Sequence, residues 1–529
     1  MSAGNVPTGV DAIASHSYTY DALDRLLTAS AGGVDVTRTY DSFGRLRKEK
    51  THGDTLEVAY ADLAGTLTRT WPDGREETLS TNLNGVVTQV ERTAAGTLGA
   101  GRAILGEFTP YGPGALGKAE FFVDPNAATT HFVETHAAYD ERKRITKLEH
   151  LSGATTLESI HYRYDTLDRR RIEMLGSGTV QARLHGFDTK DRLIQTEEES
   201  SSFSLTSVIY TQADHDSDIS AIETAMSSLS PTTYEYLFSS ATGGKADERL
   251  TYKKTPSGGT TTTTNYTYEA GHRIDDAGTE DVEHYTDGTR KKNISSTYEI
   301  DALGRIVRVK NLSGSQTRAT IDYDPLGRVS SIMTQGTTRD LSYFGNQVWQ
   351  EKVGSTITRQ ISRHPMLPGP MAMHVANETY LTLHDPRHNL LSIADSTGTV
   401  AAGNSLRYEP FGTPSVGATT SGIEPRFGGM RYLPGTQLYL SDTRLMDPRH
   451  GAWLSPDPLG YVDSPNLYAY ARQNPIDFVD PSGLGLVCIL PIKRTVGATG
   501  YRSRLIIRAP ADAAPLLRLN GERGAGGVL

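Results

Sequence analysis

Cysteine is almost absent from this chain of 529 residues, because Cys488 is the only one. A single thiol excludes an intramolecular disulfide framework and every metal site built from several cysteines. The fold must therefore be held together by the burial of apolar surface and by backbone pairing.

Long apolar runs and an excess of positive charge are also missing. No stretch of 18 apolar residues occurs, and the first residues have neither the basic nor the apolar segment of a cleaved signal peptide. The formal net charge of -9 argues against a general nucleic-acid binder. We predict no transmembrane segment and no nucleic-acid partner for the body of the protein. We expect synthesis in the cytoplasm and then export or delivery to the cell surface without a cleaved signal peptide.

Phenylalanine is scarce, whereas tyrosine and glycine are abundant. The chain has 12 Phe against 26 Tyr and 52 Gly, and 37% of its residues are hydrophobic. This composition favours turn-rich β structure over helical bundles. The predicted fold class is all-β.

One short phrase recurs along the chain, an aromatic residue and an acid followed four positions after the acid by arginine. The copies begin at Tyr20, Tyr40, Tyr139, Tyr164, Phe187, Tyr268 and Tyr323, with a variant at Ile300. Each copy predicts a strand, a tight turn and a second strand, with the arginine paired to the acid across the turn. Because a single hairpin is marginal in water, many must pair side by side in one long ribbon.

Two stretches depart from this rhythm. Residues 213–229 predict a polar loop followed by a short helix with Ser217 or Asp218 near its start. The threonine-rich stretch from Thr255 predicts either a linker or an exposed strand. We interpret both as insertions.

The repeated Tyr-Asp phrases resemble those of the RHS (rearrangement hot spot) or YD-repeat family, and the resemblance covers most of residues 18–484. It implies a long spiralling β-sheet of hairpins that forms part or all of a hollow shell. It also divides the chain into repeats at 1–379, an RHS-associated core at 380–484 and a short variable tail at 485–529.

The core ends in a doubled motif, Asp457-Pro458-Leu459-Gly460 and Asp480-Pro481-Ser482-Gly483. Asp at the first position, Pro at the second and Gly at the fourth is typical of a type I turn, so each copy alone predicts a turn. Two carboxylates could instead hydrolyse a peptide bond if the turns bring them close enough to share a proton. Spacing alone leaves both interpretations open.

The family resemblance adds a specific expectation for this motif. In RHS proteins, two DPxGL motifs separated by eighteen residues mark an intramolecular aspartyl protease that cuts after the second motif. Here residues 462–479 separate the copies, which implies catalytic Asp457 and Asp480 and a cut between Leu484 and Gly485. Tyr461 departs from the pattern, since it replaces the leucine of the first copy.

Arg444 resembles an arginine that lies beside the catalytic acid in relatives. It could hold one carboxylate ionised or orient the substrate carbonyl, or it could form only a salt bridge with Asp447 or Asp442. In the insecticidal branch of the family an Asp usually follows this arginine, whereas here the residue is Leu445.

No cofactor or metal site is predicted. The acidic run at 214–218 lacks the Gly and Glu that a calcium loop needs at its sixth and twelfth positions, which are Ile219 and Ala225. The two histidines of 384–388 have no third ligand nearby in the sequence.

Residues 485–529 have seven Lys or Arg and two acidic residues, whereas residues 1–484 have 46 basic and 60 acidic residues. The family resemblance implies that this tail is an encapsulated C-terminal peptide, which is either the remnant of a toxin or a truncated toxin. Self-cleavage would free it inside the shell. A second shell-forming chain or a secretion apparatus is the other expected partner. The alternative is a non-catalytic structural or adhesive surface protein whose tail stays attached.

Overall fold

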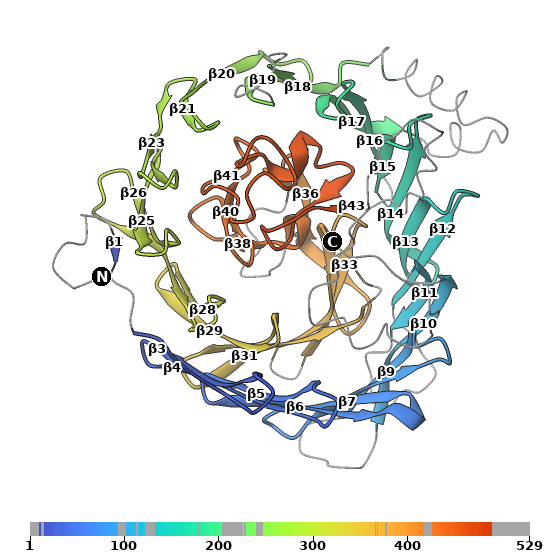
Figure 1. The fold of residues 1–529 in the computed structure, drawn as a ribbon. Coiled ribbons are helices and arrows are strands. Elements are labelled where there is room, and N and C mark those ends of the chain that lie inside the picture. Colours follow the sequence, from blue (N-terminus) through green and yellow to red (C-terminus); the bar gives the residue numbers. More distant parts are fainter. Residues whose placement is uncertain are drawn as a thin grey trace, which may run out of the picture.

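The computed structural model describes residues 10–11, 15–93, 102–112, 115–121, 133–176, 180–203, 226, 229–239, 247–365, 367, 369–375, 378–416 and 426–488. Strands dominate these residues, which confirms the all-β prediction. Figure 1 shows a ring of strands around a smaller central unit. Among the described residues, no helix is long and apolar enough to cross a membrane.

The first sheet contains strands β2 to β22, and each strand pairs antiparallel with the next along the chain. Its strands are β2 (Ser17–Tyr20), β3 (Leu26–Ala31), β4 (Val34–Tyr40), β5 (Leu46–Thr51), β6 (Asp54–Ala61), β7 (Thr66–Thr70), β8 (Glu76–Thr81), β9 (Val87–Thr93), β10 (Arg102–Gly112), β11 (Ala115–Phe121), β12 (Val133–Tyr139), β13 (Ile145–Ser152), β14 (Thr155–Tyr164), β15 (Arg170–Leu175), β16 (Val180–Phe187), β17 (Leu193–Phe203), β18 (Thr232–Phe238), β19 (Arg249–Thr255), β20 (Thr262–Tyr268), β21 (Ile274–Ala277) and β22 (Glu280–Asp281). A short 3-10 helix, η1 (Asp62–Ala64), joins β6 to β7.

The second sheet continues in the same way, with β23 to β35 in sequence order and β1 added parallel to β25. Its strands are β1 (Val10–Asp11), β23 (Glu283–His284), β24 (Arg290–Lys292), β25 (Ser296–Asp301), β26 (Ile306–Asn311), β27 (Thr317–Tyr323), β28 (Val329–Thr334), β29 (Thr337–Phe344), β30 (Gln347–Val353), β31 (Thr356–Arg363), β32 (Pro370–Val375), β33 (Glu378–His384), β34 (Leu390–Ala394) and β35 (Val400–Ser405). The expected boundary at residue 379 lies inside β33.

In several repeats the turn is built by the aspartate, the arginine and a tyrosine of the next hairpin. Asp21 Oδ1 accepts the Leu23 and Arg25 amides at 2.9 and 3.0 Å, and Arg25 Nε donates to Oδ2 at 2.7 Å. The Arg25 guanidinium lies 4.8 Å from the Tyr40 ring centre, and the Tyr40 hydroxyl donates to the Leu26 carbonyl at 3.0 Å. The predicted Asp–Arg pair is confirmed, and the tyrosine locks the preceding turn through a cation–π contact.

The same three-residue arrangement recurs around the ring. It joins Asp41, Arg45 and Tyr60, then Asp140, Arg144 and Tyr164, and then Asp301, Arg305 and Tyr323. Because consecutive strands are antiparallel, alternate turns share one edge of the sheet. The turns of Asp21, Asp41 and Asp140 share one edge of the first sheet, and the turn of Asp301 lies on an edge of the second sheet. We call each of these edges the YD edge of its sheet.

The first sheet packs against the YD edge of the second. Arg328 donates to Glu49 of β5 at 2.6 Å, and the Tyr18 hydroxyl donates to the Pro325 carbonyl at 2.8 Å. Trp71 and Trp349 meet edge to face with ring centres 5.3 Å apart. In Figure 1, β28 to β31 accordingly lie just inside β3 to β7.

The central unit, residues 406–488, lies inside the ring (Figure 1). Its elements are β36 (Arg407–Tyr408), β37 (Pro414–Val416), η2 (Phe427–Gly429), β38 (Arg431–Leu433), β39 (Leu438–Leu440), β40 (Leu445–Asp447), β41 (Ala452–Trp453), η3 (Tyr470–Gln473), β42 (Phe478–Val479) and β43 (Val487–Cys488). One apolar cluster joins it to the first sheet through Tyr236 and Phe238, and another joins it to the second sheet through Tyr298 and Ile321. The central unit is thereby fixed against both sheets.

The second half of the threonine-rich stretch forms β20, a mostly exposed strand that pairs with β19 and β21. The exposed-strand alternative is therefore confirmed, and this part of the chain is a regular strand of the first sheet rather than an insertion. Most of residues 213–229, including Ser217 and Asp218, lie outside the described residues.

Candidate active site

Arg444 lies directly before β40, where a tight turn aims its side chain inward. The Arg444 amide donates to Ser441 Oγ and the Ser441 hydroxyl donates to the Arg444 carbonyl, both at 2.9 Å. The side chain is 2% exposed, and its guanidinium lies 4.3 Å from the Trp453 ring centre. The turn and the tryptophan together fix the direction of the guanidinium.

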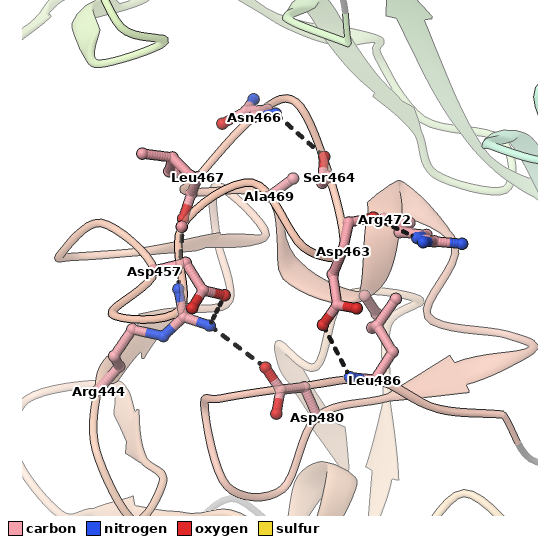
Figure 2. A pocket seen from close by; sticks show the side chains of 12 residues that line it. Arg444, Asp457, Asp463, Ser464, Asn466, Leu467, Ala469, Arg472, Asp480 and Leu486 are labelled. Carbon is pink, nitrogen blue, oxygen red and sulfur yellow. Dashed lines mark hydrogen bonds and ion pairs between the residues drawn. The ribbon is translucent and has the colours of Figure 1, made fainter. Parts of the chain in front are cut away.

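The guanidinium joins the two aspartates of the doubled motif. Arg444 Nη2 lies 2.9 Å from Asp457 Oδ2 and 3.3 Å from Asp480 Oδ2, and Nη1 donates to the Leu467 carbonyl at 3.3 Å (Figure 2). The structure thus brings together the three side chains that the sequence singled out. The alternative partners are engaged differently, since Asp447 pairs with Arg449 at 2.8 Å.

Both copies of the motif are also turns. Asp457 Oδ1 accepts the Leu459 amide at 2.8 Å, and the Gly460 amide donates to the Asp457 carbonyl at 3.0 Å. Asp480 Oδ1 accepts the Gly483 amide at 2.9 Å and the Leu484 amide at 3.2 Å. The turn interpretation and the two-carboxylate interpretation therefore describe the same residues.

The second turn also reaches the peptide bond between Leu484 and Gly485. The amide nitrogen of that bond, Gly485 N, lies 3.1 Å from Asp480 Oδ1. A carboxylate oxygen is therefore in contact with the nitrogen that would leave if this bond were hydrolysed.

The chain is held firmly on both sides of this bond. Upstream, the Thr443 hydroxyl lies 2.8 Å from the Ser482 carbonyl oxygen and 3.1 Å from that of Gly483. Downstream, the Leu486 amide donates to Asp463 Oδ2 at 3.1 Å (Figure 2). β43 then pairs antiparallel with β42, so the segment turns back on itself.

A small cavity of about 10 Å³ lies beside the carboxylates. Its polar lining includes Arg444, Asp457, Asp463 and Asp480. This is about the smallest volume that admits one water molecule, and the polar lining suits one. The site therefore has room for the second reactant of a hydrolysis.

Burial dominates the electrostatics of the site. It raises the pKa of the Asp480 carboxyl, against the opposing effects of Arg444 and of the Gly485 and Gly483 amides, and the nearby Asp457 raises it further. Burial also lowers the pKa of the Arg444 guanidinium, although both carboxylates oppose that shift. The two carboxylates are bridged by a cation between them, which differs from the proton-sharing contact that the sequence suggested.

A third acid lies close enough to influence Asp480. Asp442 precedes Arg444 in the same turn, and desolvation raises its pKa to about 6 although its side chain retains access to solvent. Arg363 and Arg431 oppose this shift, and the negative charge of Asp480 adds to it.

Two contacts of the site were not predicted from the sequence. Asp463 and Thr443 hold the flanks of the Leu484–Gly485 bond, yet neither belongs to a recognisable motif. Their role follows from where the loops meet, and a single sequence carries no signal for that.

Within the described part of the chain, no group of three or more His, Cys, Asp or Glu is placed to hold a metal. Asp385 of the 384–388 segment accepts the Arg387 and Asn389 amides at 2.8 and 2.9 Å, so this segment is another turn of the repeat type. The acidic run at 214–218 lies outside the described residues.

No family model matches the chain. It is 25% identical over 235 residues to the tRNA nuclease WapA of Bacillus subtilis, which covers 42% of this chain and 10% of WapA. It is 41% identical over 81 residues to the toxin subunit YenC2 of Yersinia entomophaga, which covers 15% of this chain and 8% of that subunit.

Solved structures share the fold over most of the chain. The crystal structure of TcdB2-TccC3 matches with a TM-score of 0.58 at 16% identity, over 89% of this chain and 28% of that chain. The spiralling β-sheet predicted from the repeats is therefore confirmed at the level of the fold. The chain spans about a tenth of the length of the curated relatives named above.

Proposed function

We propose that this protein is part of a toxin-associated RHS shell that cuts its own chain between Leu484 and Gly485, using Asp457 and Asp480 with Arg444. The observation that carries the proposal is the Arg444 bridge between the two aspartates, one of which contacts the Gly485 nitrogen. The similarity to a tRNA nuclease and to a toxin subunit supports the association with toxins.

The chemistry assigns a different role to each carboxylate. Asp457 takes a proton from a water molecule, whose oxygen attacks the carbonyl carbon of Leu484. Asp480, whose pKa is raised by burial, is the acid of the step: once the attack of water has made the Gly485 nitrogen basic, it passes a proton to that nitrogen as the carbon–nitrogen bond breaks. The products are a carboxyl group on Leu484 and an amine on Gly485, and the net reactant is one water molecule.

Arg444 holds the two carboxylates in fixed positions relative to each other. Its guanidinium contacts both carboxylates, and its position over Trp453 fixes the direction in which it points. Each chain reacts once, because the substrate is part of the chain.

The cargo is the chain that follows the cut, beginning at Gly485. β43, the last described strand, lies within the ring in Figure 1, which supports cleavage on the inner side of the wall. Shell-forming partner chains are expected as well, since the similar TcdB2-TccC3 structure combines two components.

The test is the state of the chain after synthesis. The purified wild-type protein should migrate as two pieces on denaturing gels, and the small piece should begin at Gly485. Asp457→Asn and Asp480→Asn should each stay whole. Asp41→Asn is the matched control, since Asp41 makes the same kind of turn far from the site and its loss should leave cleavage intact. A wild-type chain that stays whole would instead favour the non-catalytic scaffold.

A further inference from the structure

We infer that Asp463 is a positioning residue for the cut: its carboxylate holds the chain just after the scissile bond and so keeps the Gly485 nitrogen against Asp480. This inference rests on the proposed self-cleavage. Asp463 lies in the loop after the first DPxG copy and contributes to the wall of the small cavity.

The contact is direct and lies on the leaving side of the bond. Asp463 Oδ2 accepts the Leu486 amide at 3.1 Å, one residue beyond the Gly485 nitrogen that contacts Asp480 (Figure 2). On the other side of the bond, the Thr443 hydroxyl contacts the carbonyl oxygens of Ser482 and Gly483. The reactive peptide is therefore fixed at both ends, which is the arrangement that orientation effects require.

Asp463 is itself held in place by an unusual turn. Arg472 Nε donates to the Asp463 carbonyl oxygen. Arg472 belongs to a run of three non-glycine residues with positive φ, namely Ala471 at 49°, Arg472 at 54° and Gln473 at 62°. Such backbone conformations carry a cost and persist where the surroundings enforce them. Here the turn points Arg472 at the Asp463 loop.

The required property is a hydrogen-bond acceptor at this position. A carboxylate that accepts an amide hydrogen makes a charge-assisted bond, and an asparagine side-chain oxygen can accept the same hydrogen without the charge. An alanine cannot. Without the acceptor, Leu486 is released and the Gly485 nitrogen loses its fixed distance from Asp480.

The experiment follows the full chain during cell-free synthesis, with pulse–chase labelling and denaturing gels. Asp463→Ala should slow cleavage about 10- to 100-fold, the range expected for one charged hydrogen bond and a misplaced reacting group. The small fragment should then show additional start points beside Gly485 in its intact mass. Asp463→Asn should cut within about threefold of wild type at Gly485 alone, because it keeps the acceptor. Asp281→Ala, which removes an exposed carboxylate paired with Lys292, is the matched control and should behave as wild type.

Two results would overturn the inference. The first is an Asp463→Ala chain that cuts at the wild-type rate with a single start at Gly485. The second is an Asp463→Asn chain as slow as Asp463→Ala. Folding is compared by thermal melting in the uncut Asp480→Asn background, and Asp463→Leu, which also lacks an acceptor, replaces the alanine if that variant does not fold. Failure of the wild type to cut would count against the proposed function, which is a separate outcome.

Discussion

Asp480 Oδ1 and the Gly485 amide nitrogen lie 3.1 Å apart, so one carboxylate both closes a turn and touches the bond proposed to break. The same oxygen accepts the Gly483 and Leu484 amides. A turn built this way presents its own backbone to its own side chain. Self-cleavage needs no separate substrate pocket under this arrangement.

Gly483 should be essential for seating the turn. It has a φ of 72°, and a Cβ at this position would overlap Ser441 Oγ and Thr443 Oγ1. Gly483→Ala should therefore leave most chains uncut. Gly460 offers the matched control, because it has the same φ of 72° but open space around it. Gly460→Ala should cost about 1 kcal/mol of stability and leave the cut at Gly485 intact, as measured by the cleaved fraction on gels. Equal cleavage in both variants would argue against the seating role.

Arg444 should be replaceable only at a high cost to cleavage. A lysine ammonium lacks the second nitrogen that donates to the Leu467 carbonyl and the planar group that lies over Trp453, so Arg444→Lys should slow cleavage by about 10-fold or more. Arg444→Ala leaves the two acids facing each other without a cation, so it should slow cleavage further. Both rates are read from pulse–chase labelling, and an Arg444→Lys chain that matches wild type would refute the bridging role.

The rate of cleavage should fall as pH rises through the raised pKa of Asp480, because the protonated form that serves as the acid is lost. Asp442→Asn removes a nearby negative charge, so it should lower the pKa of Asp480 and move this limb to lower pH. The pKa of Asp442 is itself raised, so the variant and the wild type should differ most at higher pH and converge as the pH falls and Asp442 becomes protonated. Single-turnover rates across pH 4.5 to 8.5 test both statements.

Much of the two β-sheets could be predicted from the sequence, because the contacts that form each repeat turn lie close together in the sequence. The Asp and Arg of each repeat are four residues apart and meet within one turn, as in Asp41 and Arg45 at 2.7 Å. The role of the tyrosine could not be deduced in this way. Tyr60 stacks on Arg45 from a strand of the next hairpin, and that contact depends on strand order rather than on a single turn.

The residues of the candidate site likewise include some that the sequence could reveal and a contact that it could not. Asp457 and Asp480 stand out because they lie in a doubled motif, and Arg444 stands out by resemblance. The cation between the two carboxylates was not predicted, since it depends on how β40 and two separate loops pack around Trp453.

Buried histidines should make the junction between the two sheets sensitive to acid. His150 Nε2 donates to the His384 carbonyl and His364 Nε2 donates to the Val87 carbonyl, each at 3.2 Å. Burial lowers the pKa of His150 and His364 to about 4 and that of His384 to about 3. The unfolded chain, with a histidine pKa near 6.5, then binds more protons than the folded protein between about pH 4 and 6.5.

The free energy of unfolding should accordingly be highest above pH 6.5 and fall as the pH drops toward 4. Each such histidine should contribute a loss on the order of 3 kcal/mol. Thermal melting between pH 7.5 and 4.5 measures the loss. His364→Gln should make the melting temperature less dependent on pH, whereas His136→Gln, at a partly exposed residue, should not. A melting temperature that is constant over this range would contradict the prediction.

The repeat arginine should contribute very different amounts of unfolding free energy at two places in the ring. Arg328 is 10% exposed and binds the fully buried carboxylates of Asp324 and Glu49 across the junction of the two sheets. Arg25 makes the equivalent pair with Asp21 on the free YD edge, where the two side chains are 28% and 19% exposed. Arg328→Ala leaves two buried charges without their cation and should cost about 3–5 kcal/mol, whereas Arg25→Ala should cost about 1 kcal/mol or less. Denaturant unfolding of both variants in the uncut Asp480→Asn background measures the difference. If the two variants lost similar amounts of unfolding free energy, the first sheet would not cover the second at Arg328. The two turns have the same Asp–Arg pair, and they differ in whether the first sheet packs over that pair.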